Sequence, residues 1–381
     1  MKKTLAAVAV LGAFVGSALA ADVQLYGVVD TGLRYTHFDG DAAAAGYDAV
    51  DKFEMKSGQQ SGSRFGFKGT EDLGNGLTVG FILENQFNSD DGSLSDSDHF
   101  FRREASLFLE GGFGKIAMGR IGSINNGVSS WAQFGMLSAF GTSWDYSAQM
   151  GTWAVGAGIW DNMIAYQTPT FAGFTVYAQY GMGSNNNENE SSSDRYYALG
   201  AKYANGPLNL YLAVDSINYQ TADLTAGVNA DDIDDSLTVT FGGNYDFEVV
   251  KLFAGAQYYD EAKISTAFGL LDSADYNAQT YAGKFKGWSL GVSASIPAAG
   301  GQVLVGAGYM DAEAADSQKA AKDDELTRWV VSAGYDYPLS KRTNVYGILT
   351  YAQDSLDYTD TAAKDQDPTV FAAMIGLRHK F

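Results

Sequence analysis

Apolar and polar side chains alternate along most of this chain with a period of two residues, the pattern of β-strands that have two different faces. One stretch places Val23, Leu25, Val29 and Leu33 on one face and Gln24, Asp30 and Arg34 on the other. The alternation predicts sixteen strands, at residues 22–36, 61–70, 77–87, 101–110, 115–121, 162–168, 173–182, 195–204, 208–219, 236–247, 249–259, 276–296, 302–310, 326–337, 343–353 and 369–381.

The links between these strands alternate in length. Even-numbered strands end in short links such as GGFG and ANGP, whereas odd-numbered strands end in long polar loops such as GSNNNENESSSD. Transmembrane barrels sort their loops in this way, with short turns at the periplasmic rim and long loops at the extracellular rim. The link lengths therefore favour a barrel over a soluble sandwich.

The polar face of the predicted strands carries full charges. Arg64 and Lys68 alternate with the apolar Phe65 and Phe67. A strand in a membrane barrel shows alternate side chains to lipid and to the lumen, and sixteen strands enclose an aqueous channel in which charges are hydrated. The predicted fold is all-β: a 16-stranded antiparallel transmembrane barrel.

The first twenty residues, MKKTLAAVAVLGAFVGSALA, combine two lysines, a short apolar stretch and a small-residue cleavage site. This combination is typical of a secretory signal peptide, and its apolar stretch is too short to span a bilayer. We expect residues 1–20 to be removed on export and residues 21–381 to form the barrel.

Composition excludes several classes of function. The chain has no cysteine and a net charge of −20, which argues against disulfides, thiol chemistry and nucleic-acid binding. Its three histidines, at positions 37, 99 and 379, have neither metal-ligand spacing nor a recognisable catalytic partner. We therefore expect no enzyme activity, no cofactor and no dedicated metal site.

Several stretches resemble the general porins of Gram-negative outer membranes: QLYGVVDTGL, SRFGFKGTEDLGNGL, GGFGKIAMGR, NMIAYQTPTFAGFTVYAQY and the terminal IGLRHKF. The last residue, Phe381, resembles the assembly signal of that family. The resemblance implies a homotrimer in the outer membrane, passive diffusion of small hydrophilic solutes and ions, and a long third loop folded into the barrel.

That third loop is predicted at residues 122–161. The resemblance makes it the constriction loop, with Asp145 and Asp161 as its acidic residues, yet it is also rich in tryptophan and other large apolar side chains. Those side chains either pack the loop against the wall or line the opening and favour less polar solutes. The second possibility leaves open a substrate-specific channel with a binding site on this loop.

The resemblance also places a ladder of arginines on the wall opposite the loop. Arg34, Arg64 and Arg103 match it, with Lys68 and Glu84 on the same wet face. A transverse field between these arginines and Asp145 or Asp161 would then select solutes. Ile159 and Ala165 stand where relatives often carry arginine, so we expect a mild cation preference. Alternatively, the arginines are structural partners of Asp30 or Glu84.

Arg120 shares the parity of Ile116 and Met118, which is the lipid-facing side. Because an arginine facing lipid is costly, we expect Arg120 to contact a second protomer or the second long loop, residues 88–99.

The long loops carry most of the acidic residues. A concentration of negative charge at an entrance attracts cations, and it also suits divalent cations shared with outer-membrane lipid such as lipopolysaccharide. Simple solvation of the acids explains the pattern equally well, and adhesion through these loops is a further alternative.

Overall fold

The computed structural model describes residues 23–40, 49–142, 144, 151–154, 158–183, 193–219, 234–264, 284–316, 325–357 and 365–381. The predicted signal peptide, residues 1–20, lies outside them. Seventeen strands and one short 3-10 helix, η1 (Phe134–Leu137), occupy the described residues. The strands are β1 (Gln24–Asp39), β2 (Ala49–Ser57), β3 (Arg64–Gly74), β4 (Leu77–Gln86), β5 (Glu104–Gly111), β6 (Gly114–Gly122), β7 (Ile159–Gln167), β8 (Phe174–Gly181), β9 (Arg195–Asn205), β10 (Leu208–Asn218), β11 (Leu237–Asp246), β12 (Lys251–Ala262), β13 (Phe285–Ala298), β14 (Gly301–Ala314), β15 (Glu325–Pro338), β16 (Thr343–Asp357) and β17 (Thr369–Lys380).

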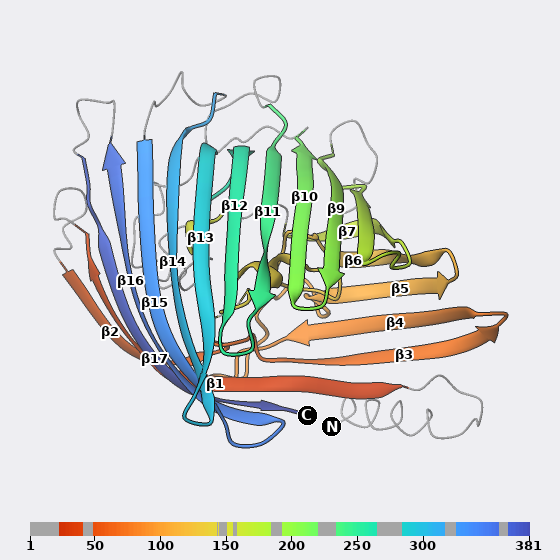
Figure 1. Ribbon diagram of the computed structural model, residues 1–381, viewed down its shortest axis with the longest axis horizontal. Coiled ribbons are helices and arrows are strands. Elements are labelled where there is room, and N and C mark those ends of the chain that lie inside the picture. The colour runs from red at the N-terminus through yellow and green to blue at the C-terminus, as the bar shows by residue number, and fades with distance from the viewer. Residues whose placement is uncertain are drawn as a thin grey trace.

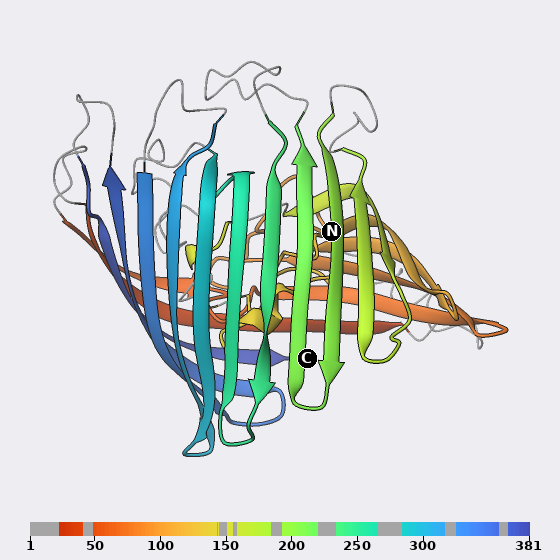
Figure 2. The ribbon, with the colours of Figure 1, turned by 45° about the horizontal axis from the view of Figure 1, so that its top comes forward.

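From β3 onwards, each strand pairs antiparallel with the next, and β17 closes the sheet by pairing with β1 from Val28↔Lys380 to Asp39↔Thr369. Closure leaves the sheet without an open edge, so each strand pairs its backbone with neighbours on both sides, which is the condition for crossing lipid with strands. Figures 1 and 2 show β9 to β16 standing side by side as one curved wall. The predicted 16-stranded barrel is confirmed.

The count of seventeen arises because β2 and β3 share one position in the barrel. β2 pairs with the later half of β1, from Thr31↔Ser57 to Asp39↔Ala49, and β3 pairs with its earlier half, from Gln24↔Lys68 to Val28↔Arg64. β2 was not predicted from the sequence; its residues fall in the first predicted loop. Its period-two signal is short and contains four charged residues, VDKFEMK.

The two faces of the wall follow the predicted alternation. Leu25 and Leu33 of β1 are 56% and 37% exposed on the outer face, whereas Asp30 and Arg34 are fully buried on the inner face. The short links are tight turns; Asn75 and Gly76, between β3 and β4, have φ of 54° and 75°, as a two-residue hairpin turn of the primed type requires. No helix among the described residues is long and apolar enough to cross a bilayer.

Candidate functional site: the lumen and its constriction

The third loop lies inside the barrel and packs against its wall. Its segment from residue 123 onwards leaves β6, passes behind β11 and β12 as η1, and returns to β7 (Figure 2). Six of its large apolar side chains are at most 4% exposed: Trp131, Phe134, Leu137, Phe140, Trp144 and Trp153. They pack into two clusters with inner-face residues such as Tyr196 in one and Ile348 and Val330 in the other. Of the two interpretations of this loop, packing against the wall applies to these six.

Hydrogen bonds from wall side chains hold the backbone of the same loop. Tyr211 Oη donates to the Ile124 carbonyl over 3.1 Å, and Asn244 Nδ2 donates to the Met136 carbonyl over 2.9 Å. Gln257 Oε1, on the neighbouring strand β12, accepts the Ala154 N–H over 2.8 Å. These three wall side chains are thereby satisfied, and the loop is held to the wall at Ile124, Met136 and Ala154.

A basic cluster faces the space that the third loop leaves free. Arg64 on β3 and Arg103, just before β5, share the carboxylate of Glu84, at 3.5 Å and 2.5 Å respectively. Arg378 on β17 lies near them. The positive charges of Arg103 and Arg378 both act on the Arg64 guanidinium. Arg378 is bound by neutral groups: its Nε donates to Asn344 Oδ1 over 3.0 Å. We call Arg64, Arg103 and Arg378 the basic cluster; Arg378 was not among the residues predicted to line the constriction.

Arg34 and Lys68, which were also predicted to line the constriction, lie outside the basic cluster. The Arg34 guanidinium is fully buried and pairs with Glu54 of β2 over 2.6 Å, so its charge is compensated inside the wall. This is the structural-pair alternative, although the partner is neither Asp30 nor Glu84. Lys68 is exposed, with its ammonium 5.3 Å from the centre of the Tyr26 ring, and it adds positive charge on the inner face.

The two acidic residues predicted to face the wall arginines, Asp145 and Asp161, do not form that side of the constriction in the described residues. Asp145 lies outside the described residues. Asp161 belongs to β7, where three residue steps from Trp160 to Met163 oppose two on β6, from Ile121 to Gly119. This bulge, with Asn162 at φ 52°, reverses the alternation and turns Asp161 to the outer face. Asp161 therefore does not oppose the wall arginines.

Arg120 is the partner of Asp161. Its Nη1 donates to Asp161 Oδ1, and its Nε donates to the Arg102 carbonyl over 2.9 Å. His99, in the second long loop, approaches the same carboxylate with Nε2 at 3.5 Å from Oδ2. The charge of the outward-facing Arg120 is thus neutralised by Asp161 of the same chain, at the edge of the second loop. A contact of Arg120 with another protomer stays a prediction.

Phe381 lies at the seam where the barrel closes. Its N–H donates to the Gly27 carbonyl, and its carbonyl accepts the Gly27 N–H, both over 3.1 Å. A Cβ on Gly27 would lie 2.3 Å from the Phe381 ring, so glycine at this position makes room for the terminal aromatic. The seam offers a physical reason for the predicted assembly role.

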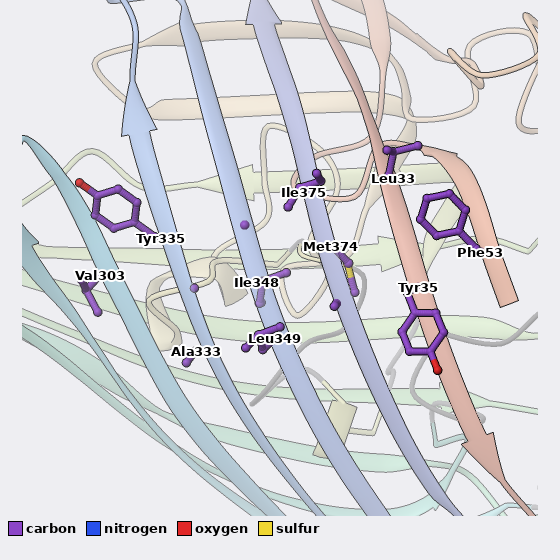
Figure 3. A pocket seen from close by; sticks show the side chains of 13 residues that line it. Leu33, Tyr35, Phe53, Val303, Ala333, Tyr335, Ile348, Leu349, Met374 and Ile375 are labelled. Atoms are coloured by element: carbon purple, nitrogen blue, oxygen red, sulfur yellow. The ribbon is translucent and has the colours of Figure 1, made fainter. Parts of the chain in front are cut away.

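The outer face carries an apolar depression over β1, β2 and β14 to β17 (Figure 3). Its floor is made by small residues such as Ala333, Gly347 and Ala373, and larger side chains, Tyr35, Phe53 and Tyr335, stand around it. On the extracellular side Tyr35 Oη donates to Asp51 Oδ1 over 2.6 Å.

A closed barrel with an apolar outside, a charged inside and a loop fixed within the lumen defines a membrane channel. The chain belongs to the Gram-negative porin family, whose sequence profile matches residues 6–357. It is an outer-membrane porin: it is 34% identical to an outer membrane porin protein of Bordetella pertussis, over 100% of both chains. It is also 32% identical to outer membrane porin protein 32 of Delftia acidovorans, over 93% of this chain and 90% of the relative.

Solved structures agree. An anion-selective porin from Comamonas acidovorans superposes with a TM-score of 0.68 at 25% identity, covering 95% of this chain and 100% of that one. OmpF of Salmonella typhi, in complex with daunomycin, gives a TM-score of 0.62 at 18% identity over 94% and 97% of the two chains. The second likeness shows the fold alone.

Proposed function

We propose that this porin is a general diffusion pore for small hydrophilic solutes that favours anions over cations. The observation that carries the proposal is the charge balance of the basic cluster. Arg64 and Arg103 share one carboxylate, Glu84. Arg378 hydrogen-bonds to neutral groups and has the buried Asp30 as its nearby carboxylate, so three guanidiniums face two carboxylates. Because the charges that line a pore set its ion preference, this excess of positive charge attracts anions.

The proposal replaces the mild cation preference expected from the sequence. That expectation relied on Ile159 and Ala165 standing where relatives often carry arginine. The acidic counterpart predicted opposite the arginines is also missing at Asp161, which faces outward. The expectation also missed Arg378. The anion-selective porin from Comamonas acidovorans, at 25% identity, supports the same direction.

Passive diffusion is favoured over a substrate-specific channel by the state of the third loop. A specific site for aromatic or apolar solutes requires exposed aromatic faces in the lumen. Trp131, Trp144 and Trp153 are instead at most 4% exposed against the wall. We propose that the loop acts as a rigid size filter, and that the chain catalyses no reaction.

For assembly, we propose a homotrimer embedded in outer-membrane lipid, including lipopolysaccharide, with residues 1–20 removed on export. One relative, OmpT of Vibrio cholerae, has a solved trimer form at 17% identity. The apolar depression over β1, β2 and β14 to β17 is a suitable contact surface because small residues allow close approach. Divalent cations at the acidic extracellular loops are part of the same proposal.

Liposome swelling tests passive diffusion. Purified protein is reconstituted, and swelling rates are measured with neutral sugars of increasing size and with carboxylic acids of matched size. The proposal expects rates that fall smoothly with size, rise linearly with concentration and are higher for the anions. A rate that saturates with one solute while its size-matched analogues pass slowly would indicate a specific binding site instead.

A further inference from the structure

The wall is interrupted where β2 passes to β3. Along β1, Thr31 pairs with Ser57 and Val28 pairs with Arg64. A continuous strand would bring residue 60 opposite Val28, so the chain accommodates four additional residues here. With the two residues that a continuous strand would place here, they form the segment 58–63, of sequence GQQSGS, which begins at Gly58 with φ 70°. We call it the inner segment.

Asp30 of β1 clamps the inner segment to the inside of the wall. Its Oδ2 accepts the backbone N–H groups of Gln60 and Ser61, over 2.9 and 2.7 Å. Its Oδ1 accepts the Tyr346 hydroxyl over 2.5 Å. Asp30 itself is fully buried. A carboxylate that accepts several N–H and O–H bonds is a strong fixed anchor.

Gln60 extends the attachment across the barrel seam. Its Nε2 donates to Asp336 Oδ2, and its Oε1 accepts from Asn344 Nδ2, both over 2.8 Å. Gln59 and Gln60 are at most 4% exposed, whereas Ser61 and Gly62 keep some exposure. The middle of the inner segment is therefore presented to the lumen while its flanks are buried.

Because the inner segment leaves the wall, a gap remains beside β1, and Ser89 of the second long loop fills it. The Ser89 hydroxyl donates to the Asp30 carbonyl over 2.9 Å, and the Ser89 N–H donates to Ser57 Oγ over 2.8 Å. Ser89 thus takes the place that residues of the inner segment would have had in the wall. Because the backbone of β1 is satisfied in this way, the inward path of the inner segment is a regular part of the fold.

All three arginines of the basic cluster meet the inner segment. Arg64 Nη1 donates to the Gly62 carbonyl over 3.0 Å, and Arg378 Nη1 lies 3.5 Å from Ser61 Oγ. A Cβ on Gly62 would lie 3.3 Å from Arg103 Nη1. The inner segment therefore lies between arginines that come from the β3–β5 side and from β17.

We propose that the inner segment is a second constriction element of the pore, that it holds the basic cluster in place, and that Asp30 is its positioning residue. The third loop narrows the lumen from one side, and the inner segment narrows it from the side of β1. Anionic solutes pass over Ser61 and Gly62, where three guanidiniums converge. This inference rests on the proposed anion-favouring pore and assigns the location of its selectivity.

Cysteine labelling tests the location, because the chain contains no cysteine of its own. Ser61→Cys changes one atom of a partly exposed side chain. Single channels of this variant are recorded before and after adding a methanethiosulfonate that carries either a sulfonate or a trimethylammonium group. We expect both reagents to lower the conductance, with the anionic reagent reacting about tenfold faster because the cluster concentrates anions.

Ser97→Cys, on an exposed site of the second loop, is the matched control and should be modified without a change in conductance. If Ser61→Cys is modified with no change in current, or fails to react at all, the inner segment does not line the pore. An equal rate for the two reagents would overturn the assigned site of selectivity. The unmodified current of the same channel tests the pore itself, so the two proposals fail separately.

Asp30→Asn tests the positioning role. An amide in place of the carboxylate cannot accept at both oxygens, so the inner segment should loosen, anion preference should fall and current noise should rise. Glu110→Gln, which removes an exposed carboxylate at the periplasmic end of β5, is the control for charge alone. If both variants shift the reversal potential equally, Asp30 acts only through its charge and the positioning role is wrong.

Discussion

Arg328 on β15 and Asp354 on β16 form a buried, two-pronged ion pair, with Nε and Nη2 donating to the two carboxylate oxygens over 2.6 and 2.7 Å. Both side chains are at most 1% exposed. The third guanidinium nitrogen, Nη1, donates to the Gly151 carbonyl over 3.0 Å. One pair of charges thus connects the barrel wall to the third loop.

Breaking this pair should destabilise the barrel and release the third loop. Asp354→Ala leaves Arg328 buried without its counter-charge, which costs about 3–5 kcal/mol. We expect a lower unfolding temperature by circular dichroism in detergent, together with noisier single-channel currents. The double variant Arg328→Met with Asp354→Leu should recover much of the thermal stability but not the quiet current, since the bond to Gly151 is absent. Equal stability of the single variant and the natural protein would contradict this assignment.

The closing seam predicts two separable effects at Phe381. Deleting the residue removes both backbone hydrogen bonds to Gly27, worth about 0.5–1.5 kcal/mol each, as well as the ring. Phe381→Ala keeps the backbone bonds and loses only the ring. Refolding yield into detergent, read from the shift in gel mobility, should fall in the order natural protein, Phe381→Ala, deletion. An equal yield for all three would place the role of Phe381 outside barrel closure.

Strands and faces were predictable because each depends on local alternation. β2 was missed because charged Lys52, Glu54 and Lys56 occupy its inner positions and its outer positions include Asp51. A period-two reading extended to charged stretches would have found it. The aromatic residues of the third loop were recognised, but their docking depends on partners far away in sequence, such as Tyr346 against Trp144.

The constriction was less predictable, because bulges and insertions change which way a side chain points. One extra residue in β7 reverses Asp161, and four extra residues after β2 create the inner segment. Neither has a signal in hydrophobic period. Glycines at 58 and 62 around two glutamines were the available hint, since such a stretch interrupts a strand. The role of Asp30 follows only from three-dimensional contacts.

The second long loop should be stable to mild acid. Burial raises the pKa of Asp96, but hydrogen bonds from the Asp98 N–H and from His99 outweigh it, so the pKa is lowered overall. A carboxyl with a lowered pKa stabilises the fold above its unfolded pKa of about 3.9, and this contribution is lost as the pH falls through the folded value. Protection of the loop should therefore persist from pH 7 to pH 5.

Limited pepsin digestion from pH 5 to pH 2 checks this expectation, with cleavage sites within residues 88–103 located by mass spectrometry. Cleavage should appear only in the most acidic samples, and Asp96→Asn should show it already at pH 5. Cleavage of the natural protein at pH 5 as fast as at pH 2 would mean that Asp96 does not hold this loop.

The reversal potential of single channels in a tenfold KCl gradient tests the central claim most directly, because it reports the sign of charge that governs the lumen. The account predicts anion preference in the natural protein, a stronger preference in Glu84→Gln, where two guanidiniums lose their shared carboxylate, and a weaker one in Arg103→Gln. A cation-selective natural channel, or two variants that leave its reversal potential unchanged, would contradict it.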